Sequence, residues 1–221
     1  MSRALLAVGL AFGLLTACSG APASVEQTSA TPSPTAPETA GVTETTTEPV
    51  EPYLPVPEDV ELTEPGTALE LTEPATVAWE APDAKKVSVA RIKILSFERA
   101  KIGVLRDWKL NKENRKATPY FVRARVTNLG DGGLGGQAVP LYAQAPDNVL
   151  VAASSFKGQF GPCSPAQLPT QLPPGGKAVV CLVYLLPDGE QATGVSFYPE
   201  LAPTLAPIHW DGEATRFRSG A

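Results

Sequence analysis

The sequence has few of the side chains that perform catalysis or hold metal ions. Its 221 residues include one histidine, His209, and one methionine, the initiator. There is no Gly-x-Ser-x-Gly motif, and no acidic residue lies at a triad-like spacing from His209. One histidine without internal methionine leaves too few soft ligands for a metal centre. We therefore expect no enzyme, no metal and no cofactor. A surface hydrolase built on two carboxylates stays open as an alternative, because the sequence does not show which acids meet in the fold.

An apolar run long enough to span a membrane is also missing at the N-terminus. The run there covers residues 4–15, whereas a spanning helix needs about 20 residues. It follows one positive charge, Arg3, and ends in Leu-Thr-Ala-Cys at residues 15–18, the layout of a secretory signal. This segment resembles that of bacterial lipoprotein precursors. The resemblance implies a signal peptide over residues 1–17, a lipid on Cys18 and attachment to the extracytoplasmic face of the cell membrane.

Positive charge is absent from a long stretch after the signal. Residues 4–84 contain 13 acidic side chains and no Lys or Arg. From Ser19 to about Pro65 the chain alternates Pro, Thr, Ala and Glu, which cannot bury enough apolar area to offset the entropy of ordering. We predict a disordered acidic tether over residues 18–65 and a folded domain over residues 66–221. Sugars on the threonines are an alternative role for the tether.

The remaining sequence shows short β-strand patterns. Residues 120–127 alternate apolar and polar side chains, as in a strand with one buried face. The parity of the apolar positions changes within residues 87–98, which indicates a β-bulge or a strand covered on both faces. Residues 177–186 are almost continuously apolar, as in a central strand covered on both sides. Other strands are predicted over residues 67–80 as one broken edge strand, and over residues 139–144, 149–153, 193–198 and 208–210. About seven or eight short strands predict an all-β fold, a β-sandwich.

Several motifs follow one another in this domain. Residues 120–130 end in Val-x-Asn-x-Gly, and Pro-Gly-Gly-Lys follows at residues 174–177, Cys-Leu-Val-Tyr at 181–184 and Pro-Asp-Gly at 187–189, before a closing Trp210. The order of these motifs resembles that in a family of bacterial lipoproteins, notably from actinomycetes, which have immunoglobulin-like domains of unknown function. The resemblance covers roughly residues 86–210. It implies an immunoglobulin-like β-sandwich and no catalytic residues.

Cys163 and Cys181 are the two cysteines that remain once Cys18 carries a lipid. Exported proteins fold in an oxidising compartment, so we expect these two to form a disulfide between a loop and a core strand. In the entropy model, closing this loop lowers the entropy of the unfolded chain and so stabilises the folded state by about 3 kcal/mol. Two free buried thiols are the alternative.

Positive charge is concentrated in one predicted loop. Residues 85–125 contain 13 basic and 3 acidic side chains, and residues 99–118 form a polar stretch that is long for a hairpin loop. Long loops in compact domains are usually functional or mobile. Within it, Ile102, Leu105 and Trp108 at a spacing of three allow two helical turns. The candidate binding residues are Arg99, Lys101, Arg106, Lys109, Lys112, Arg115 and Lys116.

This charge pattern predicts a binding or interaction module at the cell envelope. Its expected partner, besides the membrane reached through the lipid, is an envelope polyanion or an acidic protein, and not nucleic acid. A merely solvated basic face is the alternative interpretation of the loop. An accessory subunit of an envelope transporter or secretion machine is the alternative function. The sequence predicts no oligomeric state.

Overall fold

The computed structural model describes residues 52–80, 87–130, 134–156, 158, 160–199 and 204–218. All of them belong to one compact unit, Glu48–Ala221. The predicted signal peptide, the predicted lipidation site Cys18 and the predicted tether as far as residue 51 lie outside the described residues. Within the described part of the chain, no helix is long and apolar enough to cross a membrane.

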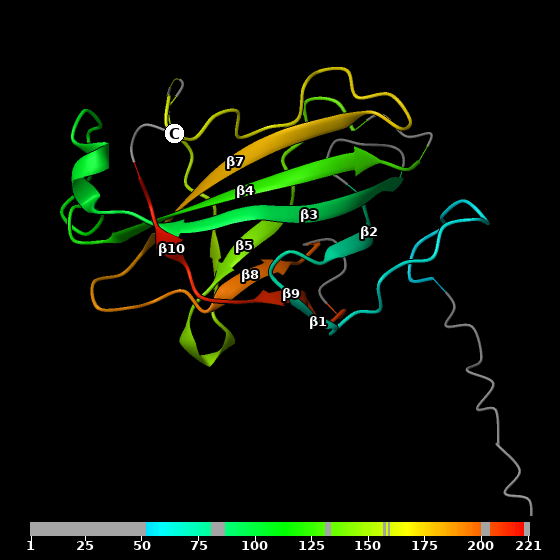
Figure 1. The fold of residues 1–221 in the computed structure, drawn as a ribbon, viewed down its shortest axis with the longest axis horizontal. Helices are drawn as coiled ribbons and strands as arrows, with labels where there is room; N and C mark the ends of the chain where they lie inside the picture. The colour runs from blue at the N-terminus through cyan, green and yellow to red at the C-terminus, as the bar shows by residue number, and fades with distance from the viewer. Residues whose placement is uncertain are drawn as a thin grey trace, which may run out of the picture. The chain divides into compact units, whose positions relative to one another are not determined.

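Two β-sheets stack face to face (Figure 1). The first sheet has the order β1-β9-β8-β5-β6, and the second has the order β10-β3-β4-β7 with β2 also paired to β3. The strands are β1 (Ala68–Glu70), β2 (Pro74–Glu80), β3 (Val87–Arg99), β4 (Thr118–Asn128), β5 (Leu141–Gln144), β6 (Leu150–Ala152), β7 (Lys177–Leu186), β8 (Gly194–Phe197), β9 (Ile208–Asp211) and β10 (Thr215–Arg216). Two 3₁₀ turns, η1 (Ile102–Leu105) and η2 (Pro146–Asn148), interrupt the loops.

The all-β sandwich is confirmed, with more strands than expected. The described residues form ten strands, because β1 and β2 are separate strands and because β10, only 2 residues long, carries no alternation that could reveal it. A strand this short is recognised only by its pairing with β3, where Arg216 lies beside Arg99.

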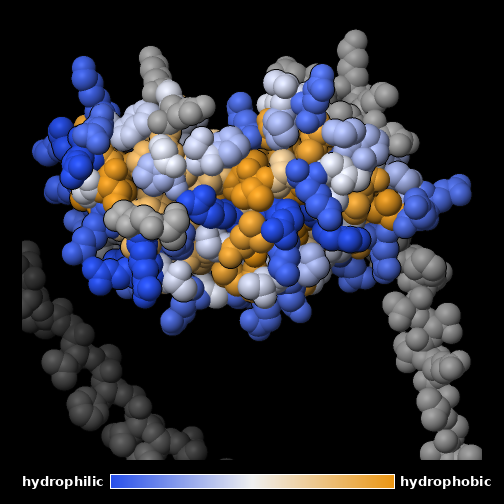
Figure 2. All heavy atoms as spheres, turned by 45° about the horizontal axis from the view of Figure 1, so that its top comes forward, coloured by the Kyte–Doolittle hydropathy of each residue, from blue (hydrophilic) through white to orange (hydrophobic). Residues whose placement is uncertain are grey.

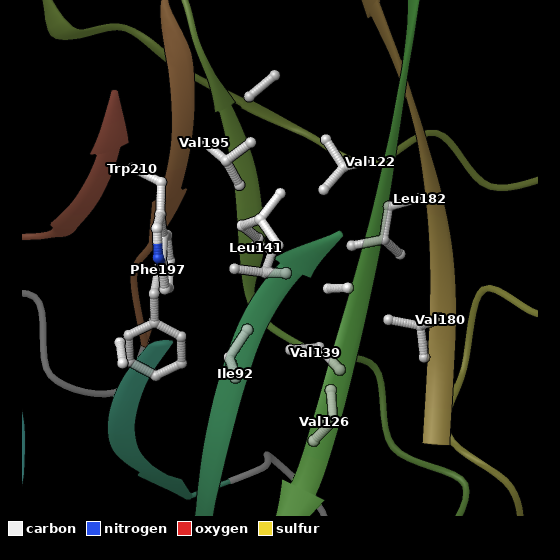
Figure 3. Packing of buried hydrophobic residues seen from close by; sticks show 14 of the residues in the cluster. Ile92, Val122, Val126, Val139, Leu141, Val180, Leu182, Val195, Phe197 and Trp210 are labelled. Atoms are coloured by element: carbon white, nitrogen blue, oxygen red, sulfur yellow. The ribbon is translucent and has the colours of Figure 1, made fainter. Parts of the chain in front are cut away.

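The hydrophobic core lies between the two sheets. The inward side chains of β4 are those that the alternation predicts: Tyr120, Val122, Ala124 and Val126 are all buried. Side chains from both sheets point into the same space (Figure 3). Across it, the Tyr184 hydroxyl donates a hydrogen bond of 2.8 Å to the Leu141 carbonyl. The alternation of β4 thus decides which of its faces meets the other sheet.

A β-bulge accounts for the change of parity in β3. The pairing register between β3 and β4 shifts between Ile94 and Ser96, and the skipped residue, Leu95, is 37% exposed. One extra residue moves the inward positions from even to odd numbers, so that Ile92 and Phe97 both reach the core. The bulge is the first of the two explanations that the sequence allowed.

The expectation of one broken edge strand over residues 67–80 is wrong. β1 pairs in parallel with β9 in the first sheet, whereas β2 pairs antiparallel with β3 in the second. The chain crosses between the sheets at a turn in which the Glu73 amide donates to the Glu70 carbonyl at 2.9 Å. The indole nitrogen of Trp210 donates to the Glu73 carbonyl at 2.8 Å and holds this corner.

Residues 52–65, which their composition assigns to the tether, lie against the domain. The Tyr53 hydroxyl accepts from the Ala78 amide at 3.0 Å and donates to the Ala78 carbonyl at 3.1 Å. Thr63 binds both backbone groups of Thr76, at 2.9 and 2.8 Å. These contacts satisfy the free edge of β2, which would otherwise expose unpaired backbone groups. The packed part of the chain therefore begins before residue 66.

β7 is covered on both faces from Val180 to Leu186, as predicted, whereas Lys177 and Val179 are exposed. It is the last strand of its sheet rather than a central one. The crossing segment after β6 covers its free edge: the Ser154 amide donates to Val183 and the Cys181 amide donates to Pro165, both at 2.7 Å. A disulfide joins Cys163 of this segment to Cys181 of β7, as predicted, with 5.0 Å between the Cα atoms. β7 can be both apolar and the last strand of its sheet because the crossing segment covers its edge and keeps it from pairing with another chain.

Candidate binding grooves on the outer sheet face

A second apolar cluster covers part of the outer face of the β3-β4-β7 sheet. Phe121 of β4 and Val183 of β7 point away from the sandwich core and pack under Leu105 of η1 and Phe160 of the crossing segment. Phe121 and Leu105 are fully buried, although neither belongs to the space between the sheets. The outer face therefore carries its own small core, built from two loops and the disulfide.

η1 fixes the start of the basic loop on this small core. The turn spans only Ile102–Leu105, and the amide of Trp108 then donates to the Leu105 carbonyl at 3.0 Å. The two predicted helical turns are replaced by this one short 3₁₀ turn, in which residues i and i+3 lie above one another. The spacing brings Ile102, Leu105 and Trp108 to the same apolar cluster.

Aromatic side chains from distant parts of the chain meet here. Trp108 lies 4.9 Å from Phe156 and 6.2 Å from Phe160 between ring centroids, both edge to face. Phe121 lies 4.7 Å from Phe217, near the C-terminus, and 5.6 Å from Phe160. Edge-to-face pairs at these distances stabilise the folded state by more than the burial of their surface area alone. Trp108 and Phe156 are only partly buried, so the cluster presents aromatic surface to solvent.

An open groove of about 1330 Å³ runs along this aromatic surface, and we call it the aromatic groove. Its apolar walls are made by Val104, Trp108, Leu110, Phe156, Phe160 and Phe217. Its volume exceeds that of usual small-ligand sites, about 300–1,000 Å³. The space suits a ligand that has apolar surface to bury.

A second, smaller groove of about 590 Å³ lies at the start of the basic loop, and we call it the cationic groove. Arg99, Lys101 and Arg216 line it together with Thr118, and none of its lining residues is acidic. Lys101 lines both grooves. Three cations around one hollow, with no carboxylate in the lining, form an environment for an anion.

The seven predicted basic residues are all exposed, but the structure does not bring them to one site. Lys101, Arg106 and Lys109 line the aromatic groove, and Arg99 lines the cationic groove. The other three, Lys112, Arg115 and Lys116, line neither groove. Among the residues that the structure describes, only Arg106 of the seven has an ion pair, at 3.9 Å from Asp107 with both side chains more than four-fifths exposed. Such a pair contributes little.

A second group of cations, outside the seven candidate residues, lies on the same outer face. Arg91, Lys93, Arg125 and Lys177 point outward from β3, β4 and β7 and are exposed, and Lys93 lies directly opposite Arg125. Like charges in directly opposed positions destabilise a sheet. The basic residues within the alternation of residues 120–127 could have revealed part of this group. Figure 2 shows strongly hydrophilic side chains interspersed with apolar ones on the face turned to the viewer.

The imidazole ring of His209 has one polar partner among the described residues. Its Nδ1 atom lies 2.8 Å from the hydroxyl oxygen of Ser196, its neighbour on β8. Ser196 is fully buried, so this hydroxyl is closed to a substrate. No group of three or more His, Cys, Asp or Glu residues suited to a metal ion occurs among the described residues.

These features define a class of protein, a two-sheet β-sandwich with an aromatic groove on one outer face and a cationic groove at the end of β3. Neither a protein-family model nor a curated protein matches the sequence. Among solved structures, the chain is similar to MPT63, a secreted protein from Mycobacterium tuberculosis, with 11% identity and a TM-score of 0.45. The similarity covers 66% of this chain and 96% of that one.

Proposed function

We propose that the protein is a lipid-anchored extracytoplasmic module that binds an anionic component of the cell envelope and acts without catalysis. The observation that carries the proposal is the pair of adjoining grooves, in which exposed cations surround half-buried aromatic rings. The cations attract an anion over a long range, and the rings supply contact area once it has arrived.

The location in the envelope rests on the N-terminal segment and on the disulfide. A lipid on Cys18 would hold the domain on the membrane, since each buried methylene of an acyl chain contributes about 0.8 kcal/mol. A disulfide between Cys163 and Cys181 is in keeping with an oxidising compartment. Palmitate labelling of the cells should mark the wild-type protein and not a Cys18→Ala variant. Label that persists in the variant would contradict the anchor.

Binding is tested on residues 19–221, which contain every described residue, with two anionic probes: inorganic polyphosphate and vesicles rich in phosphatidylglycerol. We expect binding to at least one probe at low salt, and a steep loss of affinity as salt rises. The groove variant Lys101→Gln/Arg106→Gln/Lys109→Gln should bind at least about tenfold more weakly, at about 0.5 kcal/mol for each exposed contact.

The matched control is Lys112→Gln/Arg115→Gln/Lys116→Gln. It removes the same charge from the same loop, but from side chains that line neither groove. A loss of affinity that is equal in the two variants would mean that the loop acts only as a diffuse basic face. No binding to either probe at low salt would refute the proposed function.

A further inference from the structure

We propose that the two grooves form one site for a single anionic amphiphile, a lipid with a phosphate headgroup. The phosphate lies in the cationic groove and the hydrocarbon chain lies in the aromatic groove. This inference rests on the proposed function and names the chemical class of its ligand.

The two grooves adjoin in the structure. Lys101 lines both of them, and the next residue, Ile102, lines the cationic groove while it packs against the apolar cluster that forms the aromatic one. At the edge strand β10, Arg216 lines the cationic groove and its neighbour Phe217 lines the aromatic groove, and these consecutive residues point to opposite faces of the sheet. A ligand that fills both grooves therefore passes around this end of the sheet beside Lys101, from charged to apolar walls.

The cationic groove suits a phosphate. β10 lies beside the end of β3, with Arg216 level with Arg99, so both guanidinium groups come from neighbouring positions of one sheet. Guanidinium groups bind phosphate oxygens in pairs, and Lys101 adds a point charge. The Thr118 hydroxyl is a further donor in the lining. A carboxylate has one negative charge and two acceptor oxygens, fewer than three cations can bind. A phosphate monoester carries more charge and more acceptor oxygens, and therefore matches this groove better.

The aromatic groove suits a hydrocarbon chain. Trp108 and Phe156 present partly exposed rings along it, and Phe160 closes its base with 7% of its surface exposed. A polyanion without apolar groups would use the cations and leave this aromatic surface in water. A hydrocarbon chain covers it, and each fully buried methylene contributes about a fourfold gain in affinity, which is 0.8 kcal/mol. The apolar lining thus favours an amphiphile over a polymer of phosphates.

Intrinsic fluorescence reports occupancy of the aromatic groove. Of the three tryptophans, Trp79 and Trp210 are buried in the sandwich core, at 3% and 0% exposure, while Trp108 lines the groove. Octyl, decyl and dodecyl phosphate are titrated into residues 19–221 below their critical micelle concentrations. We expect the emission of Trp108 to change with saturation. Affinity should rise about fourfold for each two methylenes, because an open groove covers about half of the chain surface.

Two variants separate the two halves of the site. A side chain at Gly103, in the lining of the aromatic groove, would meet no atom within 4 Å of its Cβ position. Gly103→Trp should therefore fill the groove, fold normally and abolish the dependence on chain length, with Gly103→Ala as its control. Arg99→Gln/Arg216→Gln should weaken binding of every chain length by about fivefold, with Arg115→Gln/Lys116→Gln as the control of equal charge.

The outcomes distinguish this inference from the proposed function. Affinity that rises with chain length, is lost in Gly103→Trp and does not occur for dodecyl maltoside supports a site for a lipid phosphate. Binding of polyphosphate or vesicles without any chain-length dependence of the alkyl phosphates overturns the inference and leaves the proposed function in place. Equal affinity for dodecyl maltoside also overturns it, because the headgroup then contributes nothing. No binding to any anionic probe refutes both.

Discussion

Removing the disulfide should loosen both the domain and the wall of the aromatic groove. The bond joins residues separated by 18 positions, and closing a loop of this length stabilises the folded chain by about 3 kcal/mol in the entropy model. Both cysteines are also buried, Cys163 at 4% and Cys181 at 1% exposure. In a Cys163→Ala/Cys181→Ala variant, each methyl-sized void adds about 1 kcal/mol. The free energy of unfolding should therefore fall by about 3 to 5 kcal/mol.

The loss should be measurable in two ways. For a domain of this size, about 3 to 5 kcal/mol corresponds to a melting temperature lower by roughly 6 to 20 °C in calorimetry. Urea titrations should give the same loss in free energy, with a larger m value, because the unfolded chain without the bond exposes more surface. Reduction of the wild-type protein with a thiol is the matched control and should give a similar loss.

The groove should respond to the same change. The Cys163 amide donates to the Phe160 carbonyl at 2.9 Å, so the bond and the aromatic wall belong to one turn. Release of this turn should expose Trp108 further and shift its emission to longer wavelength before global unfolding. A double variant within about 1 kcal/mol of the wild type would refute the reasoning, because loop closure alone predicts about three times that value.

Three further variants test other contacts. Tyr184→Phe removes the hydrogen bond to Leu141 and should lower the free energy of unfolding by about 1 kcal/mol at pH 7, measured with urea. Burial raises the pKa of Tyr184 well above its ordinary value of 10.0, so wild-type stability falls as pH rises above that value, and the deficit of the variant should shrink at about pH 11. Lys93→Glu places opposite charges across from Arg125 and should stabilise by about 0.5 kcal/mol at low salt. Tyr53→Phe removes two hydrogen bonds at the free edge of β2 and should cost about 1 kcal/mol, with faster amide exchange along that edge.

For each of these variants, one outcome would contradict the prediction. A Tyr184→Phe deficit that is the same at pH 7 and at about pH 11 would mean that ionisation of the hydroxyl is not linked to unfolding. A Lys93→Glu variant that is less stable than the wild type at low salt would show that no repulsion acts across this pair. Unchanged amide exchange in Tyr53→Phe would show that residues 52–65 do not protect the strand.

The outer face of the second sheet combines two features. One part carries buried aromatic and aliphatic side chains under two loops, and the other carries exposed cations such as Lys93 and Arg125 without an ion pair among the described residues. Exposed like charges in opposed positions lower stability. An anion bound on this face would offset that repulsion, which agrees with the proposed function.

The sequence by itself determined what depends on neighbours along the chain. The alternation in residues 120–127 decided which side of β4 is buried, because successive side chains of a strand point to opposite faces. The change of parity in residues 87–98 indicated a bulge or a strand covered on both faces, because one extra residue reverses that alternation, and the structure places the bulge at Leu95. The pairing of Cys163 with Cys181 followed from the number of cysteines and the predicted compartment.

Only the tertiary structure decided which distant segments lie side by side. β1 and β2 look like one interrupted strand, yet they belong to different sheets, because β1 pairs with the distant strand β9 whereas β2 pairs with its neighbour β3. The aromatic groove combines Trp108, Phe156 and Phe217, which no local pattern connects. The basic loop was visible as a run of charge, but the division of its cations between two grooves and open solvent depends on how η1 and β10 meet the end of β3. Strand pairing and loop packing are contacts across long sequence separations, and a single sequence carries no local signal for them.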